Sequence, residues 1–174
     1  MSDDPLGKIT EGKDLLGKVK NFLAEYVGYF DRENRRDADK LLRETASKRY
    51  EEQWGRISEL QKQFIQMGKL EFVDDLEAAA LKLRAFIDRV KGAAYGYAPF
   101  FDAVRIHGEE LERLYQYDAA LLEGVDNIAR AIDNVEASID SEGFPAALRH
   151  LVSLSQEVVD TYNRREEVIL ETSS

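Results

Sequence analysis

Apolar residues recur along most of the chain at alternating steps of three and four positions. The clearest series comprises Val73, Leu76, Ala80, Leu83, Ile87, Val90 and Ala94. Such an alternation places one apolar stripe along an α-helix and is typical of a coiled-coil seam. Similar series cover 9–30, 111–139 and 148–169, and a less strict series covers 42–67. The pattern therefore predicts an all-α chain.

Glycine and proline mark where these helices end. The chain has three prolines, Pro5, Pro99 and Pro145. No obligatory helix breaker therefore lies within residues 6–98, and long helices are allowed there. Breaks are expected at Gly68, within 92–108 and at 141–145, where Gly143 suits a helix C-terminus and Pro145 the first turn of the next helix. The predicted helices cover 6–30, 34–67, 70–94, 109–141 and 145–171.

Helices of this size span roughly 37 to 51 Å at 1.5 Å per residue. We therefore expect an elongated antiparallel bundle of four to five long helices with coiled-coil-like seams. The 174 residues are expected to form one domain, with flexible ends at 1–5 and 172–174. Whether 6–30 and 34–67 are separate helices or one continuous helix stays open, because Gly28 weakens a helix without ending it.

Charge is divided unevenly along the chain. Residues 1–108 hold 19 basic and 19 acidic side chains, whereas residues 109–174 carry the entire net charge of −10. An acidic half argues against nucleic-acid binding, which needs a positive face. No apolar window is long enough for a membrane span, and residues 1–10 lack the pattern of a secretory signal. We expect a cytoplasmic protein.

Several chemistries lack the residues that they require. Without cysteine, the chain cannot form disulfides, thiolate zinc sites, iron–sulfur clusters or thiol nucleophiles. The two histidines, His107 and His150, follow Val104 and Ala147 by three positions, where a di-iron bundle needs glutamate. Phosphate-loop, dinucleotide and hydrolase motifs are absent. The sequence therefore predicts no catalytic residue, no metal and no cofactor.

Aromatic residues and arginines are expected to gather at one end of the bundle. In an antiparallel path, the end of the first helix, the start of the second, the end of the third and the loop over 92–108 all meet there. Such residues are typical of contact surfaces. The alternative is that the rings plug the open end and the arginines lie on a solvated face. The candidate interaction end comprises Tyr29, Arg32, Arg35, Arg36, Tyr95, Tyr97, Phe100, Phe101 and Arg105.

Polar residues interrupt two of the seams. Asp118 lies between Leu114 and Leu121, where a buried carboxylate is costly unless it is paired. Three arrangements of Asp118 are open. It pairs with an arginine across the bundle, or it lies in a wide polar end of the bundle, or the seam is locally rotated so that Ala119 or Leu122 faces inward. Ser155 and Arg165 interrupt the last seam, which predicts less complete packing toward the end of that helix.

Three functions are compatible with these features. The leading hypothesis is a non-catalytic interaction or scaffold module whose partner is another protein or a second copy of the chain. The second is reversible membrane-surface association through 6–30, which carries Lys8, Lys13, Lys18 and Lys20 beside its apolar stripe. The third is a small-ligand pocket or enzyme at the aromatic end, which needs a cavity beside Asp118 and Arg105. The identity of any partner and the oligomeric state stay open, as does whether loop 92–108 forms a pocket or a plug.

Overall fold

The computed structural model describes residues 35–96 and 108–172. Within these residues every regular element is helical, so the all-α class is confirmed for this part of the chain. The elements are α2 (Arg35–Gln66), the short 3₁₀ helix η1 (Leu70–Phe72), α3 (Val73–Gly96), α5 (Gly108–Ser138) and α6 (Phe144–Thr172). The expected helix over 6–30, its continuity with the next helix and the ends at 1–5 and 173–174 lie outside the described residues.

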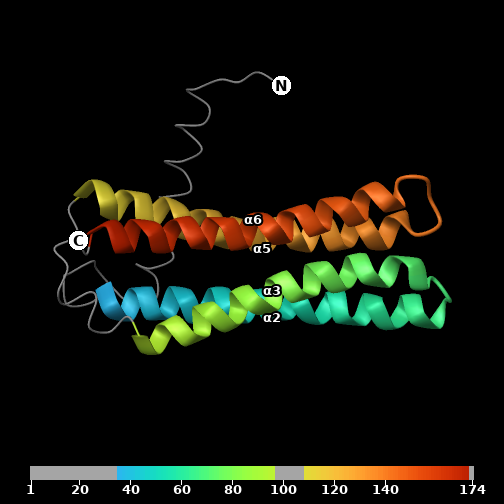
Figure 1. The fold of residues 1–174 in the computed structure, drawn as a ribbon, viewed down its shortest axis with the longest axis horizontal. Coiled ribbons are helices and arrows are strands. Elements are labelled where there is room, and N and C mark those ends of the chain that lie inside the picture. Colours follow the sequence, from blue (N-terminus) through green and yellow to red (C-terminus); the bar gives the residue numbers. More distant parts are fainter. Residues whose placement is uncertain (1–34, 97–107, 173–174) are drawn as a thin grey trace, which may run out of the picture.

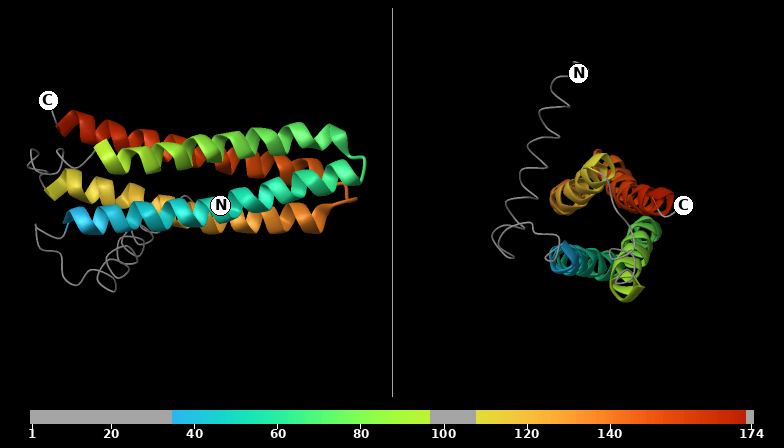
Figure 2. Two further views of the ribbon diagram at one scale, coloured as in Figure 1. Left: turned by 90° about the horizontal axis from the view of Figure 1, so that it is seen from below. Right: turned by 90° about the vertical axis from the view of Figure 1, so that its left-hand side faces the viewer.

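The four long helices pack in a ring. Helix α2 contacts α3 and α5, and α6 contacts the same two helices. Figure 1 shows the four helices running alongside one another, and Figure 2 shows the ring end-on. The α2–α3 and α5–α6 connections lie at one end, which we call the turn end. The starts of α2 and α5 and the ends of α3 and α6 lie at the opposite end, the loop end.

Gly68 ends α2 in the way that the sequence predicts. Its φ of 73° is a left-handed conformation, which costs glycine little. The Gly68 amide donates to the Ile65 carbonyl at 3.1 Å, and the Lys69 amide donates to the Phe64 carbonyl at 2.9 Å. These two bonds form a Schellman cap, which satisfies carbonyls that the helix end would otherwise leave open. The chain then reverses through η1 into α3.

The α5–α6 turn begins earlier than expected, because α5 ends at Ser138 and not near residue 141. The left-handed residue there is Asp140, with φ 65°, and not Gly143. Aspartate tolerates this conformation better than most residues with a side chain. The carbonyl of Gly143 instead accepts a hydrogen bond from the Ala147 amide at 3.0 Å, in the first turn of α6. Pro145 occupies that turn, as predicted.

The predicted seams form the core. Seam residues from Tyr50 to Phe64, from Leu76 to Val90 and from Leu121 to Val135 are buried together, apart from the half-buried Trp54. At the turn end, Phe144 packs edge-to-face against Phe64 and Phe72, with ring centroids 5.4 and 4.7 Å away. Met67 was expected to continue the seam, and that prediction is wrong. It lies beyond the last residue of α2, and its side chain is exposed.

Candidate functional site

A buried ion pair joins α5 to α6 in the half of the bundle nearer the loop end. Arg165 Nε donates to Asp118 Oδ1 at 2.6 Å, and the side chains are only 5% and 8% exposed. Both residues occupy seam positions on their helices, so the same periodicity that buries their apolar neighbours turns them inward. Of the three arrangements open for Asp118, the structure has the pair with an arginine of another helix, and the neighbouring Ala119 is buried as well. The charge-assisted hydrogen bond offsets part of the cost of removing both groups from water.

A small cavity adjoins this pair. Its volume is about 20 Å³, which is enough for about one water molecule. Organic ligands occupy pockets of roughly 300 Å³ or more. Among the described residues, the space beside Asp118 therefore has room for water and not for a ligand of that size. Arg105, the other residue expected beside such a cavity, lies outside the described residues. The cavity is lined by Arg43, Ala46, Phe86, Val90, Asp118, Leu121, Leu122, Tyr162 and Arg165.

Arg43 brings a second guanidinium group to the cavity. The apolar pattern of the sequence does not identify Arg43, because the apolar series in that segment begins at Leu42. The signal was present, since Arg43 precedes the buried Tyr50 by seven residues and therefore lies on the same helix face. The described part of the cavity wall thus contains two guanidinium groups and one carboxylate.

Between Ser155 and Val168, α6 is packed more completely than the sequence suggests. Ser155 is fully buried, and its hydroxyl donates to the Leu151 carbonyl at 2.8 Å within the helix. Tyr162 and Val168 are buried on either side of Arg165. The prediction of looser packing there is wrong, because each polar seam residue is satisfied by a hydrogen bond and remains inside.

The hydroxyl group of Tyr50, on α2, forms a hydrogen bond with the backbone of α5. Tyr50 Oη donates to the Leu121 carbonyl oxygen at 2.5 Å, and Tyr50 is fully buried. Gly124 makes room for this approach, because a Cβ atom at that position would lie 2.6 Å from Tyr50 Oη and 3.3 Å from a Val158 methyl group. Burial raises the pKa of Tyr50 far above its ordinary value, and the nearby Asp126 carboxylate adds to this effect.

The structure places part of the candidate interaction end. Arg35 and Arg36 belong to the first turn of α2, and Tyr95 to the last turn of α3. Figure 1 shows that these two turns lie at the loop end. Asp118 lies in the first half of α5, whose start is at the same end. The remaining candidates lie outside the described residues: Tyr29, Arg32, Tyr97, Phe100, Phe101 and Arg105.

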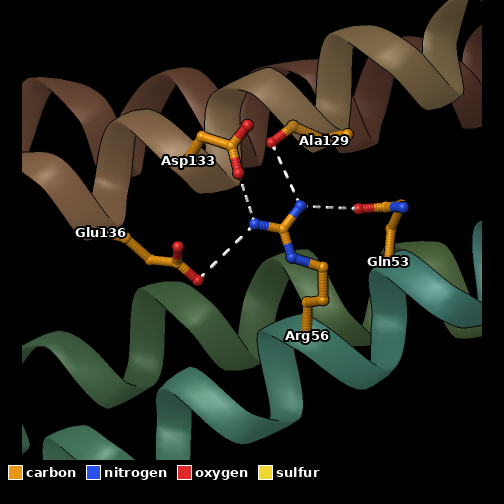
Figure 3. Close-up of polar contacts among 5 residues, drawn as sticks. All are labelled: Gln53, Arg56, Ala129, Asp133 and Glu136. Carbon is orange, nitrogen blue, oxygen red and sulfur yellow. Dashed lines mark hydrogen bonds and ion pairs between the residues drawn. The ribbon is translucent and has the colours of Figure 1, made fainter.

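Arg56 clamps α2 to α5 closer to the turn end (Figure 3). One terminal nitrogen contacts Asp133 Oδ1 at 2.5 Å and Glu136 Oε1 at 3.6 Å. The other donates to Gln53 Oε1 at 3.2 Å and to the Ala129 carbonyl at 3.4 Å. Because the carboxylates are half exposed or more, this cluster stabilises the bundle only modestly.

Comparable clamps join α3 to both of its neighbours. Arg89 donates to Asn163 and Glu166 of α6, and its guanidinium lies 5.0 Å from the centre of the Tyr162 ring. Glu51 of α2 accepts a hydrogen bond from Lys91 of α3. The described outer surface therefore carries paired charges along the helix interfaces, which fixes neighbouring helices without adding apolar surface.

Within residues 35–96 and 108–172, no group of three or more His, Cys, Asp or Glu side chains is placed to hold a metal ion. None of the described helices combines the length and the hydropathy that crossing a bilayer requires. The segment 6–30, expected to associate with a membrane surface in one hypothesis, lies outside these residues.

Comparison with known proteins finds no matching family model, no similar curated protein and no similar solved structure.

Proposed function

We propose that this chain is a non-catalytic helical bundle that acts as a protein-interaction or scaffold module, with its contact surface at the loop end. The observation that supports this proposal most is topological. The arginine-bearing first turn of α2 and the tyrosine-bearing last turn of α3 lie at the same end of the bundle. Arginine and tyrosine combine planar contact area with hydrogen-bonding groups and are enriched in protein interfaces.

The core beneath this end suits a fixed platform. Arg165 of α6 is bonded to Asp118 of α5, so the two helices are held in one register near the loop end. Buried polar pairs are best known for specifying such alignment. The proposed overall shape is an elongated antiparallel bundle of four to five long helices. Long rigid helices would hold the contact surface at a set distance from the turn end.

The proposed partner is another protein or a second copy of this chain. A nucleic acid is disfavoured, because residues 109–174 carry the whole net charge of −10. A ligand-sized cavity is not needed for this function, and the space of about 20 Å³ beside Asp118 is consistent with a water-filled core defect.

The proposal is tested by immobilising the full-length chain and quantifying the proteins that it retains. The loop-end variant combines Arg36→Ala, Tyr97→Ala and Phe101→Ala. The matched control combines Leu81→Ala and Arg130→Ala, which remove two exposed side chains from the outer surfaces of α3 and α5. Proteins retained by the wild type and by the control, but not by the loop-end variant, are then purified and titrated against all three chains. Sedimentation velocity of the same three chains measures self-association.

We expect the loop-end variant to bind a purified partner, or itself, at least about tenfold more weakly, because hot-spot aromatic and arginine side chains carry most of an interface's affinity. The control should differ from the wild type by less than about twofold. Equal association of all three chains would overturn the assignment of the contact surface to the loop end.

A further inference from the structure

The turn end carries an exposed apolar surface that the bundle itself does not use. Among the side chains that the structure describes, four large apolar ones are exposed, and three of them lie within six consecutive residues around Gly68. Ile65, Met67 and Leu70 are 55%, 47% and 62% exposed. We call these three residues the apolar tip. Single exposed apolar residues are ordinary, whereas a group at one site marks an interaction surface.

Carboxylates surround this tip. Glu71 and Asp74 follow Leu70 in the chain, and both are exposed. The neighbouring α5–α6 turn adds Asp140 and Glu142, and Lys69 connects the two turns by bonding to Asp140 Oδ1 at 2.5 Å. Lys69 is balanced by that contact, and the exposed Lys62, one helical turn before Ile65, is paired with Glu59 at 3.6 Å. The remaining charges near the tip are acidic.

The combination of an apolar centre and an acidic rim restricts the chemistry of a partner. An anionic membrane would be repelled by the carboxylates. A second copy docking tip to tip would bring an identical acidic rim against the first. A helix with an apolar face flanked by lysine or arginine would satisfy both features at once, since its apolar residues cover the tip and its cations meet the carboxylates.

We propose that the apolar tip is a docking site for a basic amphipathic helix of a partner protein. This site lies at the opposite end of the bundle from the contact surface proposed above, so the two are independent. Together they would let the rod hold two partners, one at each end.

Fluorescence anisotropy with a defined peptide tests the docking site. The probe is a labelled synthetic amphipathic helix of about 18 leucine and lysine residues, and the peptide control replaces lysine with glutamate. The full-length variants are Ile65→Ser and Leu70→Ser, with Leu81→Ser as the matched control. Leu81 lies on α3 away from the tip and is 61% exposed, almost the same as Leu70. Circular dichroism melting verifies that each variant folds.

Each tip variant should raise the Kd for the basic peptide about tenfold, because roughly one buried leucine side chain is lost from the contact. Leu81→Ser should change it less than about twofold, and the acidic peptide should not bind. The double variant Glu71→Gln and Asp74→Asn should weaken binding more than Glu123→Gln with Glu157→Gln, which removes two exposed carboxylates elsewhere.

Four results would overturn the proposal. Leu81→Ser could weaken binding as much as Leu70→Ser, which means non-specific apolar contact. The remote carboxylate pair could matter as much as the rim pair, which means general attraction to an acidic protein. Sedimentation could show self-association that Leu70→Ser abolishes, which identifies a second copy as the occupant. Flotation with phosphatidylcholine vesicles containing phosphatidylglycerol could be lost in Leu70→Ser, which identifies a lipid surface.

Discussion

At the turn end, Phe144 packs edge-to-face against Phe64 and Phe72 in a wholly apolar core layer. Toward the loop end, the ion pair of Asp118 with Arg165 is buried between α5 and α6, and a small cavity adjoins it. The turn end exposes apolar side chains around Gly68, whereas arginines occupy the first turn of α2 at the loop end.

This difference indicates how stability and specificity are divided along the bundle. Burying a phenylalanine contributes free energy of unfolding directly. A buried ion pair contributes little more than apolar residues of similar volume would, but it penalises every alignment in which either charge is left alone. We infer that the turn end supplies more of the stability and that the loop end fixes the register of α5 and α6.

The largest expected effect comes from leaving one charge of the pair alone. Asp118→Leu or Arg165→Met should each lower the free energy of unfolding by about 3 to 5 kcal/mol, because the remaining buried ion loses its partner. The double variant should recover most of this loss. Urea denaturation of the four chains measures the coupling, and single variants as stable as the wild type would show that the pair is not buried in solution.

The next effect concerns the contact at the middle of the bundle. Gly124→Ala should cost about 1 to 3 kcal/mol, because the new methyl group would lie 2.6 Å from Tyr50 Oη. In a Tyr50→Phe background the same substitution should cost clearly less, since the obstructing oxygen is gone and alanine favours the helix, while the Val158 methyl group 3.3 Å away still resists it. The test is a double-mutant cycle by urea denaturation. An equal cost in both backgrounds would disprove the close approach.

Alkaline pH should weaken the bundle through Tyr50. Its pKa is raised in the folded state, so above the ordinary tyrosine pKa of about 10 the unfolded chain releases a proton that the folded chain keeps. Stability from this group is complete well below pH 10. It should fall by about 1 kcal/mol between pH 10 and 11, and by about 1.4 kcal/mol per pH unit beyond that. Comparison of the wild type with Tyr50→Phe between pH 10 and 11 isolates this slope. Parallel curves would contradict the burial of the hydroxyl.

The smallest effect belongs to the surface clamp at Arg56. Arg56→Met should lower the free energy of unfolding by about 0.5 to 1 kcal/mol, because its carboxylate partners are largely solvated. The loss should shrink in high salt, which screens exposed pairs. Thermal melts at two salt concentrations measure it. A loss as large as that of Asp118→Leu would remove the distinction between buried and surface pairs on which the comparison of the two ends depends.

Within the described residues, the helices were largely predictable from the sequence, and the errors in that prediction have local causes. Seam periodicity identified the helices, and Gly68 identified the first turn. The same periodicity extended the seam to Met67, because a spacing rule does not register that the chain has already turned. It also placed the helix C-terminus near Gly143, whereas α5 ends at Ser138 and the left-handed residue of the turn is Asp140. Aspartate at such a position is uncommon enough that glycine is the better prior expectation.

For the buried ion pair, the sequence predicted only which face of its helix each residue occupies. Asp118 and Arg165 were each recognised as polar residues within a seam, but periodicity gives the direction of a side chain and not the register between two helices. Their pairing therefore needed the structure. The role of Gly124 was hidden for the same reason, since it depends on where the hydroxyl of Tyr50, 74 positions earlier in the chain, meets α5.

Native-state hydrogen exchange of the wild-type chain tests the difference between the two ends most directly. Amides near Ile132 and Leu148, in the apolar half, should exchange only by global unfolding. Amides near Asp118 and Arg165 should exchange through a smaller opening, with a free energy about 2 kcal/mol or more below the global value. Equal protection at both ends, or stronger protection around the ion pair, would contradict the account.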